Sequence, residues 1–379
     1  PAQGADVRGP PRAAGGEQAR QADRGGAVMA DGKVTKSDKS YIVTDGEKRG
    51  PLTMSRVKFH SAGRHVLAAC ADRRLALWDL DGTPIKEKNR EGVPGKLVCP
   101  HDLGWIRGFD VHPRGEAIAT GGSDRRLRLW KWDGEGPAES PVGDIAAHDG
   151  WVEGVAFSPD GARLASVGAD RQLKLWDVAR LTPIKAVSAH SGIPRDLTFS
   201  RDGKWIVTGG EDGVAIVWNA MTLEEVRRIE TGQTSDQQGQ HPSLGGIIRL
   251  ALSHDDRWLM LACARLSHVY ELATGMAIGE FKQFGADVAA GNTSPLLAVG
   301  SSNNMTLQTY DSGQFKPQSA EWKKNPNGKL SPPVLPPFPG QEIAPIKRSD
   351  FAFGVAFSPD DKRLATGSAN GSVEVWNVE

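Results

Sequence analysis

The sequence has few of the features that mark several large classes of protein. Its 379 residues include only three cysteines, Cys70, Cys99 and Cys263, which are far apart and odd in number. This argues against a disulfide framework or a structural zinc site, so we expect reduced thiols and a cytoplasmic protein. The sequence contains no run of about 18 apolar residues, so we expect no membrane-spanning helix. Acidic and basic residues are equal at 46 each, so no net charge favours nucleic acid or an anionic membrane.

The first 36 residues lack both hydrophobic periodicity and the apolar core of a signal peptide. They are rich in Gly, Ala, Pro, Arg and Gln, a composition typical of disorder. We therefore predict a disordered segment over 1–36 and a folded domain over 37–379. The chain begins at Pro1, so a fragment of a larger protein, a processed form and a true start near Met29 all stay open.

Tryptophan and turn residues, in contrast, are plentiful: 11 Trp against 3 Tyr, with 45 Gly and 24 Pro. The stretches "ADRRLALWDL" (71–80), "SDRRLRLWKW" (123–132) and "ADRQLKLWDV" (169–178) repeat one pattern, a charged turn that runs into an alternating strand. Five clear copies and two weaker ones define seven units, roughly 40 to 66 residues apart. Their marker residues are Trp78, Trp130, Trp176, Trp218, Tyr270, Tyr310 and Trp376.

Each unit also contains two earlier strands, such as "VAFSPDG" and "ARLASVG" in unit 3, and a more variable fourth strand after the marker. Four short antiparallel strands at this period indicate a propeller blade. The chain resembles the WD40 family over about 51–379, through "LWD" at 77–79 and 175–177, "AFSPDG" at 156–161 and "LATGS" at 364–368. The resemblance implies an all-β fold, a seven-bladed β-propeller of four-stranded antiparallel blades.

Ring closure and one insertion complete the predicted architecture. The chain ends at Glu379 after the third strand of unit 7, which leaves an edge unpaired. We expect the N-terminal strand "KSYIVTDG" (39–46) to close the ring there, as in the family that the chain resembles. A Pro-rich insertion, 316–349, contains "SPPVLPPFPG", which is either read by the groove of a partner or is a stiff surface connection.

One set of polar residues looks catalytic but recurs. His148, Ser166 and Asp170 of unit 3 are the residue types of a hydrolase triad, yet units 2 and 4 repeat the set at one period. In the family that the chain resembles, such residues and the strand Trp form a hydrogen-bonded structural tetrad. The resemblance implies three tetrads and no catalytic residue: His101, Thr120, Asp124 and Trp130; His148, Ser166, Asp170 and Trp176; and His190, Thr208, Asp212 and Trp218.

Binding residues are expected on the loops of one face of the ring, the top face, which carries the charged turns and the His segments. Trp105 and Trp151 start the first strands of units 2 and 3, and Phe351 stands in the equivalent place in unit 7. Large aromatic residues in such positions are typical interface anchors. Arginines after the turn Asp line the same sector: Arg73, Arg74, Arg125, Arg126 and Arg171. The alternative is that the arginines are solvated rim residues and the tryptophans pack under loops.

The sequence thus favours a non-catalytic, monomeric propeller that binds protein partners through its top face as a scaffold or adaptor. An alternative is an enzyme or small-molecule binder that uses the central channel, although only tetrad residues stand out as channel chemistry. Phosphate loops and HExxH motifs are missing, and Cys99 with His101 are too few for a metal site, so we expect no cofactor and no metal. Zero net charge argues against nucleic-acid binding.

Overall fold

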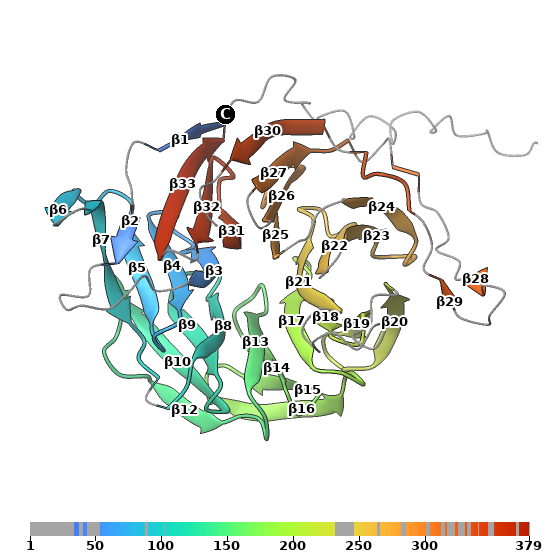
Figure 1. Ribbon diagram of the computed structural model, residues 1–379. Helices are drawn as coiled ribbons and strands as arrows, with labels where there is room; N and C mark the ends of the chain where they lie inside the picture. The colour runs from blue at the N-terminus through green and yellow to red at the C-terminus, as the bar shows by residue number, and fades with distance from the viewer. Residues whose placement is uncertain are drawn as a thin grey trace, which may run out of the picture.

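A computed structural model shows seven blades arranged as a ring around a central channel (Figure 1). It describes residues 34–37, 41–43, 54–87, 90–101, 103–231, 246–263, 266–281, 286–300, 304–311, 315–316, 323–324, 330–331, 335–339, 341–347, 352–368 and 371–378. All regular elements among these residues are β-strands, and each blade is antiparallel. The predicted fold class is therefore confirmed.

Blades 1 to 6 each have four main strands in chain order from the channel outward, and blade 7 has three such strands and takes its outer strand from the N-terminal part of the chain. Blades 1 to 4 are β3 (Met54–Phe59), β4 (His65–Cys70), β5 (Leu75–Asp79) and β7 (Arg90–Val98); β8 (Ile106–Val111), β9 (Ala117–Gly122), β10 (Arg126–Asp133) and β12 (Gly143–Ala146); β13 (Val152–Phe157), β14 (Arg163–Gly168), β15 (Gln172–Asp177) and β16 (Thr182–Ser188); and β17 (Pro194–Phe199), β18 (Trp205–Gly210), β19 (Val214–Asn219) and β20 (Glu225–Glu230).

Blades 5 to 7 follow the same plan, including the two units with the weakest sequence signal. They are β21 (Ile247–Leu252), β22 (Trp258–Cys263), β23 (Ser267–Glu271) and β24 (Ala277–Phe281); β25 (Asp287–Ala290), β26 (Leu296–Gly300), β27 (Asn304–Thr309) and β30 (Gln341–Lys347); and β31 (Ala352–Phe357), β32 (Arg363–Ser368) and β33 (Ser372–Val378). Short strands β6 (Ile85–Glu87) and β11 (Gly136–Pro137) extend blades 1 and 2, and β28 (Lys323–Lys324) pairs with β29 (Leu330–Ser331).

The core lies between the blades. In blade 3 every residue of β13 is buried, whereas the outer strand β16 is almost wholly exposed. This gradient arises because neighbouring blades converge toward the channel and cover both faces of the inner strands. All seven marker residues are buried, Tyr270 and Tyr310 included, so a large aromatic side chain fills the space between sheets in every blade.

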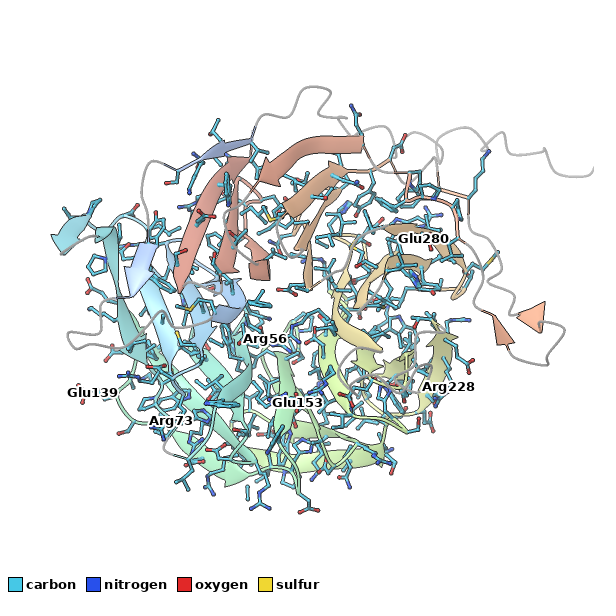
Figure 2. The ribbon with its side chains drawn as sticks, in the orientation of Figure 1. Arg56, Arg73, Glu139, Glu153, Arg228 and Glu280 are labelled. Atoms are coloured by element: carbon cyan, nitrogen blue, oxygen red, sulfur yellow. The ribbon has the colours of Figure 1, made fainter. Side chains whose placement is uncertain are left out.

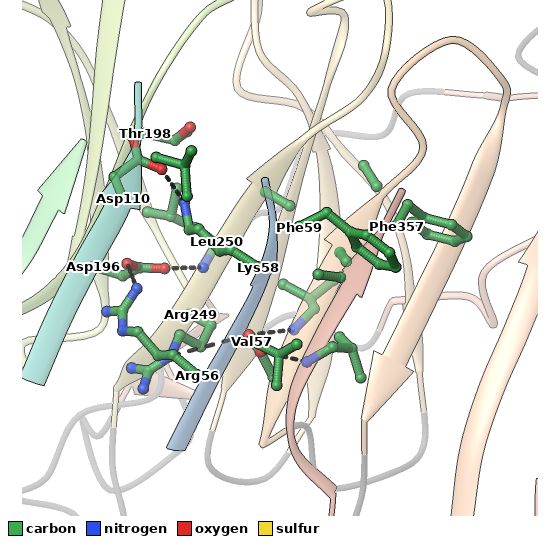
Figure 3. Close-up of a pocket in the computed structure, with 18 of the residues that line it drawn as sticks. Arg56, Val57, Lys58, Phe59, Asp110, Asp196, Thr198, Arg249, Leu250 and Phe357 are labelled. Carbon is green, nitrogen blue, oxygen red and sulfur yellow. Dashed lines mark hydrogen bonds and ion pairs between the residues drawn. The ribbon is translucent and has the colours of Figure 1, made fainter. Parts of the chain in front are cut away.

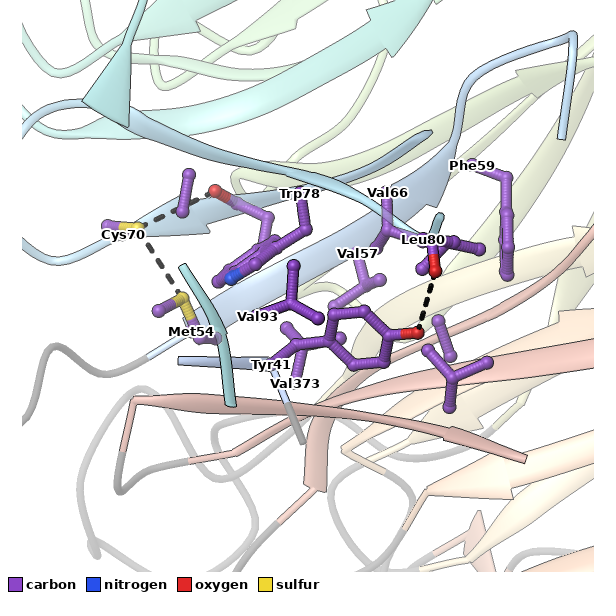
Figure 4. Packing of buried hydrophobic residues seen from close by; sticks show 14 residues of the cluster. Tyr41, Met54, Val57, Phe59, Val66, Cys70, Trp78, Leu80, Val93 and Val373 are labelled. Atoms are coloured by element: carbon purple, nitrogen blue, oxygen red, sulfur yellow. Dashed lines mark hydrogen bonds between the residues drawn. The ribbon is translucent and has the colours of Figure 1, made fainter. Parts of the chain in front are cut away.

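Two short N-terminal strands close the ring. Strands β1 (Val34–Lys36) and β2 (Tyr41–Val43) both pair antiparallel with β33, and β2 also pairs in parallel with β7, so blades 7 and 1 share one sheet. Tyr41 is buried among Trp78, Val93 and Val373 (Figure 4). The predicted closing strand is confirmed, and β1, at the end of the segment 1–36, also belongs to the ring. Residues 1–33 of the predicted disordered segment lie outside the described residues.

The Pro-rich insertion is shorter than predicted and part of it is docked on the ring. Its last part is β30, the outer strand of blade 6. Residues 335–339, here called the strap, run along β24, where Glu280 N–H donates to Pro336 O at 2.9 Å and Phe338 N–H donates to Glu280 O at 2.9 Å. Leu335 and Phe338 are buried. The blades of this chain therefore hold the strap.

Aromatic packing fixes the strap between blades 5 and 6. The ring of Phe338 lies 4.8 Å from that of Phe281 and 5.3 Å from that of Phe315, measured between centroids. Phe315 in turn packs edge-on against Trp258 at 4.7 Å. These apolar contacts explain why a surface connection carries two large hydrophobic residues.

Candidate functional site

The predicted tetrad residues of blades 3 and 4 lie together in hydrogen-bonded chains. His148 Nδ1 lies 2.9 Å from Asp170, its Nε2 lies 2.8 Å from Ser166 Oγ, and Trp176 Nε1 donates to the same hydroxyl at 2.8 Å. Blade 4 repeats this geometry, with 3.0 Å from His190 to Asp212, 2.8 Å from His190 to Thr208 and 2.9 Å from Trp218 to Thr208.

Blade 2 has a variant of the same arrangement. His101 Nε2 and Trp130 Nε1 both lie 2.9 Å from Thr120 Oγ1. The guanidinium of Arg128, however, stands between the other two members, 2.8 Å from His101 Nδ1 and 2.7 Å from Asp124. Because Arg128 Nη1 is a donor, His101 must present an unprotonated Nδ1 and carry its proton on Nε2. Burial lowers the pKa of His101 below its usual value, and the charge of Arg128 acts in the same direction while that of Asp124 opposes it.

The surroundings of Asp170 and Asp212 favour the ionised form of both carboxyl groups. Burial acts to raise the pKa of Asp212, but the hydrogen bond and charge of His190 lower it to about 2. Burial likewise acts to raise the pKa of Asp170, but the hydrogen bond and charge of His148 lower it below its usual value. The Ser166 hydroxyl is fully buried and already accepts from Trp176. A substrate therefore has no access to the nucleophile that a Ser-His-Asp mechanism needs.

The two candidate tryptophans are exposed at equivalent places in neighbouring blades. Trp105 directly precedes β8 and is 58% exposed, and Trp151 directly precedes β13 and is 48% exposed. Each is fixed to the charged turn of its own blade, because Ser123 N–H donates to Trp105 O and Ala169 N–H donates to Trp151 O. Arg107 stacks over the Trp151 ring at 4.8 Å. Phe351, the third candidate, lies outside the described residues.

Three of the candidate arginines have a left-handed backbone. Arg73, Arg125 and Arg171 have φ of 75°, 67° and 66°, whereas blades 4 and 7 carry Gly213 and Gly371 at the equivalent turn position. Each arginine carbonyl accepts an N–H from the following His segment, so the turn conformation is the same in the three blades. A non-glycine residue in this region costs roughly 1–2 kcal/mol relative to an ordinary conformation.

The charged turns present arginine to solvent and keep aspartate inside. The side chains of Asp72, Asp124 and Asp170 are 3–8% exposed, whereas Arg73, Arg125 and Arg171 are exposed. The other two candidates are paired locally, Arg74 with Asp72 at 2.5 Å and Arg126 with Asp144 at 2.6 Å. The sector of blades 1 to 3 therefore combines two exposed tryptophans with three exposed arginines.

A second charged group, which sequence reasoning missed, lies at the centre of the ring (Figure 2). Arg56 of β3 is 8% exposed and forms a 2.9 Å ion pair with Asp196 of β17, in blade 4. Its guanidinium also donates to Arg107 O at 3.0 Å and to Arg195 O at 3.3 Å. Arg249 of β21 and Asp287 of β25 lie beside this pair. We call Arg56, Asp196, Arg249 and Asp287 the ion layer.

Glycines let the innermost strands of neighbouring blades approach each other closely. The residue after the bulge of the innermost strand is charged in blades 1, 4 and 5 but is Gly108, Gly154 and Gly354 in blades 2, 3 and 7. A Cβ on Gly108 would lie 2.8 Å from Gly154 Cα, and one on Gly354 would lie 2.8 Å from the backbone nitrogen of Val57. A charged residue in some blades where others have glycine was the signal in the sequence for a charged group in the channel.

The channel beside the ion layer encloses a cavity of about 340 Å³, lined by the innermost strands of all seven blades (Figure 3). Its wall continues to Ser61, Pro113 and Asn292, in the turns that follow these strands, so it reaches the face opposite the charged turns. Lys58 and Asp110 form a 2.5 Å ion pair on the wall. Within the described part of the chain, no three His, Cys, Asp or Glu residues gather as a metal site.

The strand order defines the protein as a β-propeller, and hydrogen-bonded tetrads recur in its successive blades. Comparison with known families places it more closely. Five segments, 46–79, 95–131, 139–177, 181–219 and 348–377, match the model of the WD domain, G-beta repeat. The chain belongs to the WD40-repeat family.

Two curated relatives each match a part of the chain. The nuclear distribution protein nudF of Aspergillus terreus (strain NIH 2624 / FGSC A1156) is 28% identical over 109 residues, which cover 28% of this chain and 21% of nudF. The nuclear distribution protein PAC1-1 of Uncinocarpus reesii (strain UAMH 1704) is 30% identical over 101 residues, 26% of this chain and 19% of PAC1-1. The matches thus span about a fifth of the length of these relatives.

Structural similarity extends over the whole ring. A chain in a crystal structure of the mitotic checkpoint complex superposes with a TM-score of 0.65 at 14% sequence identity, covering 91% of this chain and 93% of that chain. At this identity the likeness shows the fold alone. Among the described residues, no helix has the length and apolar character needed to cross a membrane.

Proposed function

We propose that this propeller is a non-catalytic protein-interaction scaffold or adaptor, and that its binding surface is the top-face sector of blades 1 to 3. The observation that carries the proposal is the strained, exposed arginine in three consecutive charged turns beside two exposed tryptophans. A rigid ring holds these side chains at fixed spacing, so binding orders few groups. WD40 membership and the named relatives support a protein partner.

The charge of the sector specifies the partner further. Because the turn aspartates are buried and the turn arginines are exposed, the surface is complementary to an acidic segment with an apolar or aromatic side chain. In this proposal the chain works as a cytoplasmic monomer without cofactor or metal and contacts neither nucleic acid nor membrane. Zero net charge and buried, unpaired cysteines agree with it.

Affinity capture from the native host tests the proposal. The bait proteins are the unmodified chain, Trp105→Ala/Trp151→Ala, Arg73→Gly/Arg125→Gly/Arg171→Gly and the control Met221→Ala, which truncates an exposed residue of blade 4. We expect one partner near equimolar amounts with the unmodified chain and with Met221→Ala, and its loss with the other two. Rising salt should weaken capture, because exposed charges are screened. Equal capture by all four baits would contradict the proposed surface.

A further inference from the structure

Arg249 is a poorly neutralised cation on the wall of the channel cavity. Within the described residues its only hydrogen bond runs from Nη1 to Ile248 O at 2.8 Å, and its Nε has no acceptor. Its nearest carboxylate, Asp287, lies 4.0 Å away, although the Arg249 side chain is only 17% exposed. Arg56, by contrast, has a carboxylate at 2.9 Å and backbone carbonyls around it. Cations in such surroundings are normally paired and hydrogen-bonded.

The two carboxylates of the ion layer are already engaged elsewhere. Asp287 accepts Val355 N–H at 2.8 Å and Val288 N–H at 2.9 Å, and Asp196 accepts Leu250 N–H at 3.0 Å in addition to its pair with Arg56. Both therefore serve as links between neighbouring blades and cannot move to Arg249 without breaking a backbone hydrogen bond. The guanidinium is left with unused donor capacity toward the cavity that it lines.

The cavity has the size and walls of a small-molecule site. Its volume of about 340 Å³ lies at the lower end of ligand pockets, and its wall includes the apolar side chains of Phe59, Leu252 and Phe357. We propose that the channel binds a small monocarboxylate, with its apolar body among these side chains and its carboxylate on Arg249. A guanidinium accepts a carboxylate through two parallel hydrogen bonds, which explains the choice of arginine here.

The protonation state of Asp287 should affect ligand binding at this site. Asp287 faces Arg249 of β21, Arg56 of β3 and Asp196 of β17, and burial raises its pKa to about 6 in spite of the two arginines. Burial and the charge of Arg56 likewise lower the pKa of Arg249 to about 10. Protonation of Asp287 removes a negative charge that competes with the ligand. Binding should therefore tighten several-fold as the pH falls from 7.5 to 5.5, while the ligand carboxylate stays largely ionised.

Benzoate is a suitable probe, and calorimetric titration of the full chain at pH 5.5 and 7.5 tests the proposal. We expect one saturable site, at least tenfold weaker binding in Arg249→Gln, and unchanged binding in Arg180→Gln, which removes an exposed guanidinium far from the cavity lining. In Asp287→Asn the pH dependence should vanish while binding persists. Circular dichroism establishes that the variants are folded.

Three outcomes would overturn the proposal. The first is the absence of saturable benzoate binding at both pH values. The second is equal binding by folded Arg249→Gln and the unmodified chain. The third is tighter binding of inorganic phosphate than of benzoate, which would contradict the monocarboxylate class. None of these outcomes bears on the top-face partner, which is tested separately.

Discussion

Asp212 shows how one buried charge contributes to the stability of a blade. Its pKa in the folded chain is about 2, because the hydrogen bond and charge of His190 outweigh the effect of burial. The pKa of an aspartate in an unfolded chain is about 3.9, so the folded chain binds this proton less tightly than the unfolded chain does. The ionised carboxylate therefore stabilises the fold above pH 4, and this contribution is lost as the pH falls from about 4 to 2.

We predict that Asp212→Asn lowers the free energy of unfolding by about 1–3 kcal/mol at pH 6 and by about half as much at pH 3. Urea unfolding at the two pH values measures both differences. Asp133→Asn, which changes an exposed aspartate at the end of β10, is the control and should have little effect at either pH. An Asp212→Asn deficit that does not change with pH would show that its charge is not the source.

Individual residues were predictable from the sequence where a repeat made them visible. The members of the three tetrads recur at one period, so the family resemblance named all twelve. Arg128 was not found, because blades 3 and 4 carry Lys174 and Ile216 at that strand position and nothing in one sequence shows a guanidinium entering a tetrad. Arg249 and Asp287 were missed for a similar reason, since their neighbours come from blades far away in sequence.

Among the elements, β1 and β2 carry a disproportionate role because they complete blade 7 and join it to blade 1. We predict that deletion of residues 1–43 lowers the thermal midpoint by more than 10 °C and promotes aggregation, because the edges of β33 and β7 lose their partners. Deletion of 1–33 is the control and should leave the midpoint within about 2 °C. Similar midpoints for the two truncations would show that the ring closes without these strands.

The strap is an element whose existence the sequence indicated and whose place it did not. A Pro-rich run predicts an extended segment, but only the fold brings β24 and the aromatic residues of blade 6 beside it. Leu335 and Phe338 were the available signal, because large apolar residues are uncommon in a purely solvated connection. Units 5 and 6 were recognised more from their period than from their residues. In both blades a buried tyrosine fills the position where the motif has tryptophan.

We predict that Phe338→Ala lowers the free energy of unfolding by about 2–4 kcal/mol, because it empties a site enclosed by aromatic rings. Pro339→Ala, at the exposed next residue, should change it by less than about 0.5 kcal/mol. Urea unfolding followed by circular dichroism compares the two variants. A loss below about 1 kcal/mol in Phe338→Ala would mean that the strap adds little to the stability of blades 5 and 6.

On the scale of the whole molecule, the number of blades followed from sequence period, whereas the contents of the channel did not. Period is a local property that each unit repeats. The ion layer depends on which charged residue of one blade faces which of another, and blades 1 and 4 are separated by about 140 residues between Arg56 and Asp196. A charged residue where other blades have glycine is recognisable once the strands are in register, but its partner is set by ring closure.

The Arg56–Asp196 ion pair should stabilise the whole ring, because it connects blade 1 to blade 4 across the channel. We predict that Asp196→Ala lowers the free energy of unfolding by about 3–5 kcal/mol, since it leaves the Arg56 charge buried without a carboxylate and Leu250 N–H without its acceptor. The double variant Arg56→Met/Asp196→Leu should lose less than Asp196→Ala alone, because no uncompensated charge remains. Urea unfolding of Arg56→Met, Asp196→Leu and the double variant completes the cycle. A double variant as unstable as the sum of the single variants would mean that packing, and not the paired charge, sets the cost at the centre of the ring.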